Sequence, residues 1–248
     1  FGKTIQVSTF GASHGYAIGG IVEGLPCGHT IDIDELQAFL KRRAPGQNQL
    51  QTQRKEADIP EFLSGMVDGM LSGSPLAFMI RNTSQHSGDY NNLRDIPRPS
   101  HADFTARMRY GDKVDMRGGG HFSARLTAPL CVAGGIALQL LREKGIEIHG
   151  HLKQVGTIQD TPIDMVHPDM KALREIATEP IAMLDAYKRS EVENLVMKLK
   201  KDGDSTGGIV EVVATGLPIG LGNPNFDGIE NRLARVIFGV PAIKGVSF

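Results

Sequence analysis

Residues 116–127, with the sequence MRGGGHFSARLT, combine a glycine triplet, a serine and an arginine in a pattern that suits an anion. No side chain blocks the backbone across residues 118–120, so a flat or anionic ligand could approach it closely. Ser123 is a candidate N-cap for the apolar helix that the following sequence predicts, and exposed helix N–H groups beside Arg125 suit a phosphate. A simple tight turn before the helix is an equal alternative, because the spacing matches neither a Walker A motif nor a Rossmann fingerprint.

Two histidines lie in loops beside small residues, which is a pattern that favours proton transfer. His14 lies in GASHG at the end of a predicted strand, and His101 lies in RPSHAD. An imidazole has an ordinary pKa of about 6.5 and exchanges protons near neutral pH. The alternative for His14 is a ring bonded to a backbone carbonyl within a turn. With an arginine-rich and glycine-rich remainder, the two histidines form a candidate acid/base pair.

Two basic clusters flank a polar stretch and could bind an anionic substrate. Residues 41–43 are Lys-Arg-Arg at the end of a predicted helix, and Arg54 and Lys55 follow the polar residues 47–53. A loop between the clusters could fold over such a substrate. From residue types alone, the somewhat better interpretation is that these cations complement a helix dipole on a solvated face.

The elements that must position these residues are a mixture of strands and amphipathic helices. Asp32 with Glu35, and Ser190 with Glu193, predict capping boxes at two helix starts. The strand at 19–26 and the strand at 207–218 share the sequence Gly-Gly-Ile-Val-Glu, and a predicted helix follows each, so duplication and chance similarity are both open. Periodicity predicts strands at 3–10, 20–26, within 62–80, at 146–155 and from 207, and helices at 32–43, 123–144, 169–178, 190–201 and 226–237.

Composition indicates a globular protein and disfavours several classes of function. Of 248 residues, 40% are hydrophobic, 22% charged and 6% aromatic, and the formal net charge is −1. Neutral charge and few aromatic residues disfavour nucleic-acid binding. No apolar run approaches the roughly 20 residues that span a bilayer, and no leader is recognisable, so we expect no membrane partner and a cytoplasmic location. Cys27 and Cys131 alone predict neither a disulfide framework nor a metal site.

The ends of the chain suggest part of a longer protein. The sequence opens on Phe1, and residues 242–248 alternate like a strand with no turn after them. Natural termini are seldom placed inside a strand.

Seven motifs in order over the whole chain resemble those of the chorismate synthase family. Single motifs are moderately specific, whereas seven in order are hard to obtain by chance. They are GxSHG at 11–15, RRxPG at 42–46, RPxHAD at 98–103, RGGGxxSARxT at 117–127, GDSxGG at 203–208, GLGxPxFD at 220–227 and AIKGV at 242–246.

The resemblance implies an α+β fold, a β-α-β sandwich with internal pseudo-duplication, as one domain over 1–248 that is truncated at its C-terminus. It implies a lyase of aromatic amino acid biosynthesis, the shikimate pathway, that converts 5-enolpyruvylshikimate 3-phosphate into chorismate and phosphate. This 1,4-elimination needs reduced FMN although it involves no net redox change. The resemblance further implies a homotetramer with one FMN in each subunit.

The resemblance also implies a role for individual residues. His14 would lie near the departing phosphate, and His101 would face the flavin. Several cations suit a substrate with one phosphate and two carboxylates, because arginine binds such groups in a bidentate manner. The substrate-binding residues implied are Arg43, Arg54, Ser123 and Arg125, and the flavin-binding residues are His121, Phe122, Ser123, Pro241 and Ala242.

This sequence departs from the family pattern at a few positions. Ala12 stands where many members have Glu, and His121-Phe122 stands where many have Arg-Ser. Gln49 stands where many have an arginine, so we expect an external flavin reductant, with NADPH only an indirect source of electrons. Members continue for roughly another hundred residues, which is the size of a small domain. The alternative is therefore a folded, tetramer-forming fragment without activity. A phosphate-binding hydrolase that uses two histidines is disfavoured, since no nucleophile triad is recognisable.

Overall fold

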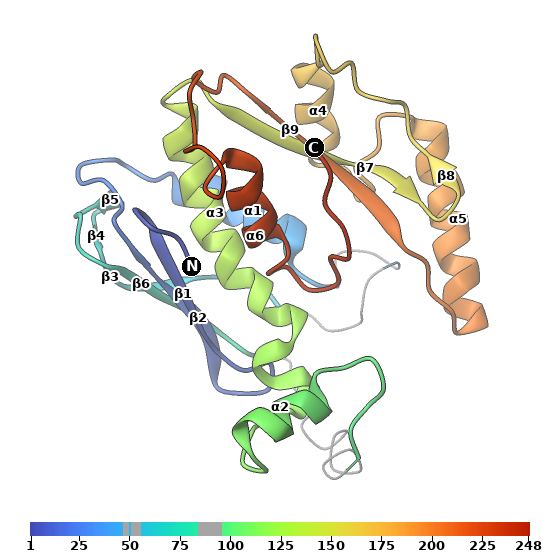
Figure 1. Cartoon of the computed structure of the whole chain (residues 1–248), viewed down its shortest axis with the longest axis horizontal. Helices are drawn as coiled ribbons and strands as arrows, with labels where there is room; N and C mark the ends of the chain where they lie inside the picture. The colour runs from blue at the N-terminus through green and yellow to red at the C-terminus, as the bar shows by residue number, and fades with distance from the viewer. Residues whose placement is uncertain (47–49, 51–55, 84–95) are drawn as a thin grey trace. The chain divides into compact units, whose positions relative to one another are not determined.

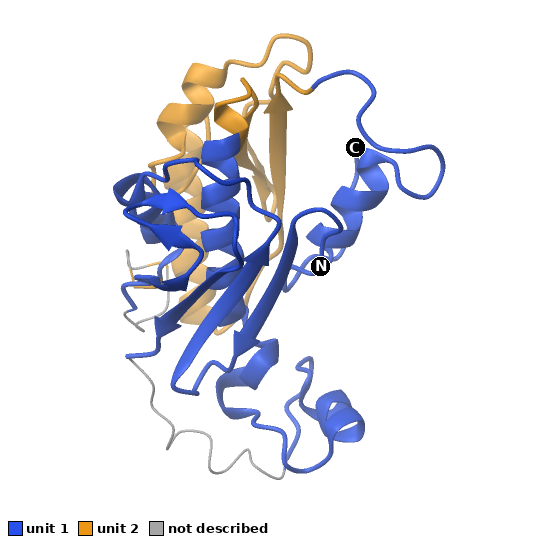
Figure 2. Ribbon diagram, turned by 90° about the vertical axis from the view of Figure 1, so that its left-hand side faces the viewer, with its two compact units in different colours: residues 1–44, 54–140, 218–248 blue, residues 45–53, 141–217 orange. Residues whose placement is uncertain are grey.

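The chain forms two compact units, which are coloured separately in Figure 2. The structure is a computed structural model and describes residues 1–46, 50, 56–83 and 96–248. Unit 1 comprises residues 1–44, 54–140 and 218–248, and unit 2 comprises residues 45–53 and 141–217. The expectation of a single domain over residues 1–248 stays a prediction.

Unit 1 contains an antiparallel sheet of four strands in the order β1-β2-β6-β3 (Figure 1). Burial alternates along β1 and β6, which places one row of their side chains toward the core and the other toward solvent. A short hairpin of β4 and β5 follows β3. The bounds are β1 Gln6–Gly11, β2 Ala17–Glu23, β3 Glu61–Ser64, β4 Met66–Val67, β5 Met70–Leu71 and β6 Leu76–Arg81.

Two helices bury their apolar sides together with this sheet in one core. Helix α1 (Ile33–Arg43) and helix α3 (Thr127–Arg142) share a cluster of buried side chains with strands β1, β2, β5 and β6. The two helices approach each other at Gly135, where an added Cβ would lie 2.5 Å from a methyl group of Leu36. The buried members of the cluster include Ile18, Val22, Leu40, Phe78, Ile80, Val132 and Ile136.

Three consecutive glycines turn the chain before α3. Within the 3-10 segment η2 (Arg117–Phe122), Gly118, Gly119 and Gly120 all have positive φ, and the turn η3 (Ala124–Leu126) leads into the helix. By length and composition the segment Arg117–Arg142 could cross a membrane, with a mean hydropathy of 1.5. The glycines break its helical conformation, however, and α3 contributes to the core of unit 1, as the core helix of a folded domain does.

The rest of unit 1 consists of two shorter helices and their connections. Helix α2 (Asp103–Tyr110) follows the loop that carries His101, and helix α6 (Ile229–Ile237) lies in the segment after residue 218. The expected alternating strand at 242–248 is wrong: these residues form a turn and irregular backbone. Ala242 has a φ of 69°, which is not an extended conformation.

Unit 2 is built on a second antiparallel sheet, in the order β8-β7-β9. Its strands are β7 (Glu147–Val155), β8 (Ile158–Gln159) and β9 (Gly208–Thr215), and helices α4 (Met170–Ile176) and α5 (Ala186–Asp202) accompany them. Ile181, Met183 and Val192 form its small buried core.

Helix caps show where sequence reasoning succeeded and where it failed. The side chain of Asp32 accepts a hydrogen bond from the Glu35 backbone N–H at 2.9 Å, as predicted for the start of α1. The predicted start of α5 at Ser190 is wrong, because the helix begins earlier in the chain. Asp185 caps it by accepting from the backbone N–H of Tyr187 at 2.8 Å.

Most of the other predicted elements are confirmed, with ends that differ by a few residues. Both strands that share the sequence Gly-Gly-Ile-Val-Glu are present and each is followed by a helix, as β2 with α1 and β9 with α6. The internal pseudo-duplication that they suggest stays a prediction.

Candidate functional site

The loop between β1 and β2 is held against the glycine turn of η2. The backbone N–H of Ser13 donates to the carbonyl of Gly120 at 3.0 Å. On the other side of the loop, Nδ1 of His121 lies 3.1 Å from the carbonyl oxygen of Gly11, although 110 residues separate the two along the chain. These two contacts bring the first and fourth sequence motifs together.

His14 lies buried in this junction, with 8% of its surface exposed. Its Nδ1 lies 3.3 Å from the hydroxyl oxygen of Ser13. A Cβ added to Gly118 would lie 2.1 Å from both Cε1 and Nδ1 of the imidazole. The glycine at 118 therefore has a specific purpose, because any side chain there would occupy the space of the His14 ring.

Asn82 connects the His14 loop to Arg125. It follows the last residue of β6, and its backbone N–H continues the sheet by donating to the carbonyl of Tyr16 at 3.1 Å. Its side-chain amide donates to the carbonyls of Ala12 at 3.1 Å and Gly15 at 2.8 Å, on either side of His14. Its Oδ1 accepts from Nε of Arg125 at 3.1 Å.

Sequence reasoning missed Asn82, although a signal was present. Leu76, Phe78 and Ile80 form the buried row of β6, and Asn82 is the next residue in that row. A polar residue at an inward position must find hydrogen-bond partners, so its place in the row marks it for a specific contact.

Two arginines share one buried carboxylate behind this loop. Asp58 forms ion pairs with Arg43 and with Arg125, one through each carboxylate oxygen. Nε of Arg43 donates to the hydroxyl of Thr127 at 3.2 Å, which fixes α1 to the start of α3. The structure thus brings together two of the predicted substrate-binding arginines.

The guanidinium of Arg125 keeps one unused donor. The residue is 5% exposed, and among the described residues its buried Nη2 has no hydrogen-bond partner. A carboxylate oxygen of Glu56 lies 3.9 Å away, and that oxygen accepts from the backbone N–H and hydroxyl of Thr83. A buried N–H without a partner is costly, so this nitrogen fits an anionic ligand oxygen.

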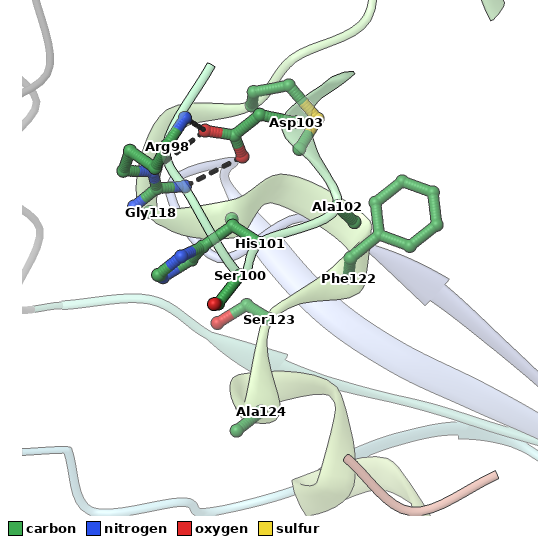
Figure 3. A pocket seen from close by; sticks show the side chains of 11 residues that line it. Arg98, Ser100, His101, Ala102, Asp103, Gly118, Phe122, Ser123 and Ala124 are labelled. Carbon is green, nitrogen blue, oxygen red and sulfur yellow. Dashed lines mark hydrogen bonds and ion pairs between the residues drawn. The ribbon is translucent and has the colours of Figure 1, made fainter. Parts of the chain in front are cut away.

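A pocket of about 280 Å³ lies beside the glycine turn (Figure 3). His101, Ser100 and Ser123 project into it from two segments, and Nδ1 of His101 lies 2.9 Å from the carbonyl oxygen of Pro99. The lining residues are Arg98, Ser100, His101, Ala102, Asp103, Met116, Gly118, Gly119, Phe122, Ser123 and Ala124.

An ion pair holds the loop that carries His101. Nε and Nη2 of Arg98 donate to the two carboxylate oxygens of Asp103 at 2.8 and 3.0 Å, and the backbone N–H of Arg98 donates to the same group. These hydrogen bonds hold the pKa of Asp103 below its ordinary value. Ser100 adopts a φ of 60°, which turns the chain sharply just before His101.

An aromatic ring and open backbone beside the pocket could contact a flat ring such as a flavin. Phe122 presents an exposed aromatic ring beside Tyr110, with ring centroids 6.3 Å apart, and the glycines leave the backbone open to a flat ring. Ser123 accepts from the Arg125 backbone N–H at 3.3 Å, two residues on, as expected for a cap. Pro241 and Ala242 are exposed residues of unit 1 that do not line this pocket.

Arg54 and Gln49 lie outside the described residues. In the described part of the chain, no group of three or more His, Cys, Asp or Glu side chains could hold a metal ion.

Comparisons with known proteins agree on one family. The family model described as chorismate synthase matches residues 5–248. A chorismate synthase of Lancefieldella parvula is 43% identical over 259 residues, which cover 100% of this chain and 68% of that protein. One of Ralstonia pickettii is 45% identical over 246 residues, which cover 99% of this chain and 65% of that protein.

A solved structure gives the same result for the fold. The crystal structure of a chorismate synthase superposes with a TM-score of 0.74 at 25% identity, over 98% of this chain and 68% of that one. This likeness confirms the predicted α+β fold. The chain spans about two thirds of the length of the relatives that it matches. It belongs to the chorismate synthase family, a family of lyases.

Proposed function

We propose that this chain converts 5-enolpyruvylshikimate 3-phosphate into chorismate and phosphate. In this 1,4-elimination the carbon–oxygen bond to phosphate breaks, and a proton leaves the carbon at the other end of the reacting unit. The observation that carries the proposal is that Asn82 links the turn of the buried His14 to Arg125, whose Nη2 has no hydrogen-bond partner among the described residues, in a chain of this family.

The anionic substrate is proposed to bind the arginines of unit 1. Nη2 of Arg125 needs an acceptor, and Arg43 lies beside it on the shared carboxylate of Asp58. Arginine N–H groups bind phosphate and carboxylate oxygens strongly, because the hydrogen bonds are charge-assisted. Arg54 and Ser123 remain proposed members of this set.

The two histidines are proposed to handle different protons. His14, as an imidazolium, would protonate or stabilise the departing phosphate. His101 would keep a proton available at the pocket. Nδ1 of His101 lies against the carbonyl oxygen of Pro99, so Nε2 is the ring nitrogen left for this role.

Reduced FMN, when bound, supplies an electron-rich ring to a reaction without net redox change. We propose that His121, Phe122 and Ser123 contact it, together with Pro241 and Ala242. We further propose a cytoplasmic homotetramer that receives reduced flavin from an external reductant, with NADPH as an indirect source.

The test is an FMN titration of this chain with and without substrate, followed by an assay of chorismate release with reduced FMN. Saturable binding that tightens with substrate, followed by turnover, supports the proposal. His14→Ala and His101→Ala should then each lower turnover at least ~10²-fold, the usual contribution of a placed acid or base. Near-normal turnover in either variant removes that histidine from the mechanism.

A second candidate is a folded, tetramer-forming fragment without activity. The observation in its favour is that the chain spans only about two thirds of its relatives' length. Circular dichroism of a folded protein that neither binds FMN nor releases chorismate would support this alternative.

A further inference from the structure

We propose that Asn82 is the positioning residue for His14, and that Arg125 fixes the orientation of the Asn82 amide. This inference rests on the proposed function for its catalytic consequence, although the contacts themselves are independent of that function. Asn82 is 9% exposed and lies at the end of the buried row of β6.

The side-chain amide of Asn82 can adopt only one orientation in this site. Nε of Arg125 is a donor and has no acceptor capacity, so it must face Oδ1 of the amide. The carbonyls of Ala12 and Gly15 only accept, so they must face the amide nitrogen. Reversing the amide would break all three hydrogen bonds.

The two donated hydrogen bonds span the turn that carries His14. Ala12 lies two residues before the histidine and Gly15 lies one residue after it, so the amide fixes the backbone on both sides. The ring has little other freedom, since Gly118 lies against it and the residue is buried. A displacement of about 1 Å at a catalytic group can lower a rate ~10²-fold.

Two variants separate this role from a general loss of stability. Asn82→Asp has nearly the same shape and keeps an acceptor for Arg125, but it no longer donates to the two turn carbonyls. Asn82→Leu removes all three hydrogen bonds without adding a charge. Both should lower kcat by about 10- to 100-fold. Asn231→Asp, at an exposed residue of α6, is the control for the added charge.

The decisive measurement is a double-mutant cycle with His14→Ala. If Asn82 acts through His14, Asn82→Asp, which keeps the acceptor for Arg125, should change kcat by less than about 3-fold once His14 is absent. Effects of Asn82→Asp and His14→Ala that multiply in the double variant would overturn the proposal, because a merely structural loss persists in both backgrounds.

A readout without turnover keeps the inference separate from the proposed function. The Hε1 proton signal of His14, assigned with His14→Ala, should shift in Asn82→Asp and Asn82→Leu but not in Asn231→Asp. An unchanged signal in both Asn82 variants would overturn the positioning role. If the wild-type chain releases no chorismate while these signals shift as expected, the proposed function fails and the positioning role stands.

Discussion

Replacing Gly118 with alanine tests the close approach of the glycine turn to His14. The new Cβ would lie 2.1 Å from two atoms of the His14 ring, more than ~1 Å inside ordinary contact. Gly118 also has φ 58° and ψ 22°, a left-handed conformation that costs an L-residue about 1–2 kcal/mol. Overpacking adds about 1–3 kcal/mol, so we expect a loss of roughly 2–5 kcal/mol in the free energy of unfolding.

Gly203→Ala is the matched control for the backbone. Gly203 has φ 68° and ψ 25°, nearly the same conformation, and a Cβ added there meets nothing within 4 Å. This control should lose only the left-handed cost of about 1–2 kcal/mol. Gly119→Ala provides a second control within unit 1, since its Cβ would lie 3.4 Å from the Cβ of Ser123.

The assay is urea unfolding followed by circular dichroism, together with the Hε1 signal of His14. The ring can relieve the overlap by rotating away, in which case the loss of stability is smaller and the signal shifts. Either result agrees with the geometry. A Gly118→Ala variant that is no less stable than Gly203→Ala, with an unchanged His14 signal, would refute the close approach.

Three carboxylates give further predictions. Asp58→Asn leaves two arginines without their shared charge and should cost about 3–5 kcal/mol in urea unfolding, part of which inorganic phosphate restores by mass action. Hydrogen bonds from Arg98 lower the pKa of Asp103. The ionised carboxylate therefore stabilises the fold above the unfolded pKa of about 3.9, and this stabilisation is lost as pH falls through the folded pKa. Asp103→Asn should flatten the dependence of the free energy of unfolding on pH below about pH 4. A hydrogen bond from Lys153 lowers the pKa of Glu211, so Glu211→Gln should likewise reduce acid sensitivity below about pH 4.3.

Local patterns predicted the elements of this chain better than their exact ends. Alternation found β1 and β2, and the apolar period found α3, because each pattern reflects which side is buried. The cap of α1 at Asp32 was predicted, since a carboxylate three residues before a free N–H is a local arrangement. The start of α5 was missed because both Asp185 and Ser190 are good caps, and local sequence does not choose between them.

The residue types of the site could be predicted from the sequence, but the contacts that hold these residues in place could not. The motifs identified His14 and Arg125, whereas the residues that hold them come from elsewhere in the chain. Asp58 and Asn82 carry no motif by themselves, and their roles depend on long-range packing of the loop after α1 and the end of β6. The inward row of β6 was the only local signal for Asn82.

Burial explains why such connecting residues matter as much as the groups that they hold. Arg125 is enclosed, so its charge is stabilised by Asp58 and its direction by Asn82. A buried guanidinium with fixed partners has few alternative positions, so those partners also set the direction of its remaining N–H groups. The same amide that directs Arg125 also holds the turn of His14. A change that removes the whole amide, such as Asn82→Leu, should therefore affect both the group that binds an anion and the group that gives it a proton.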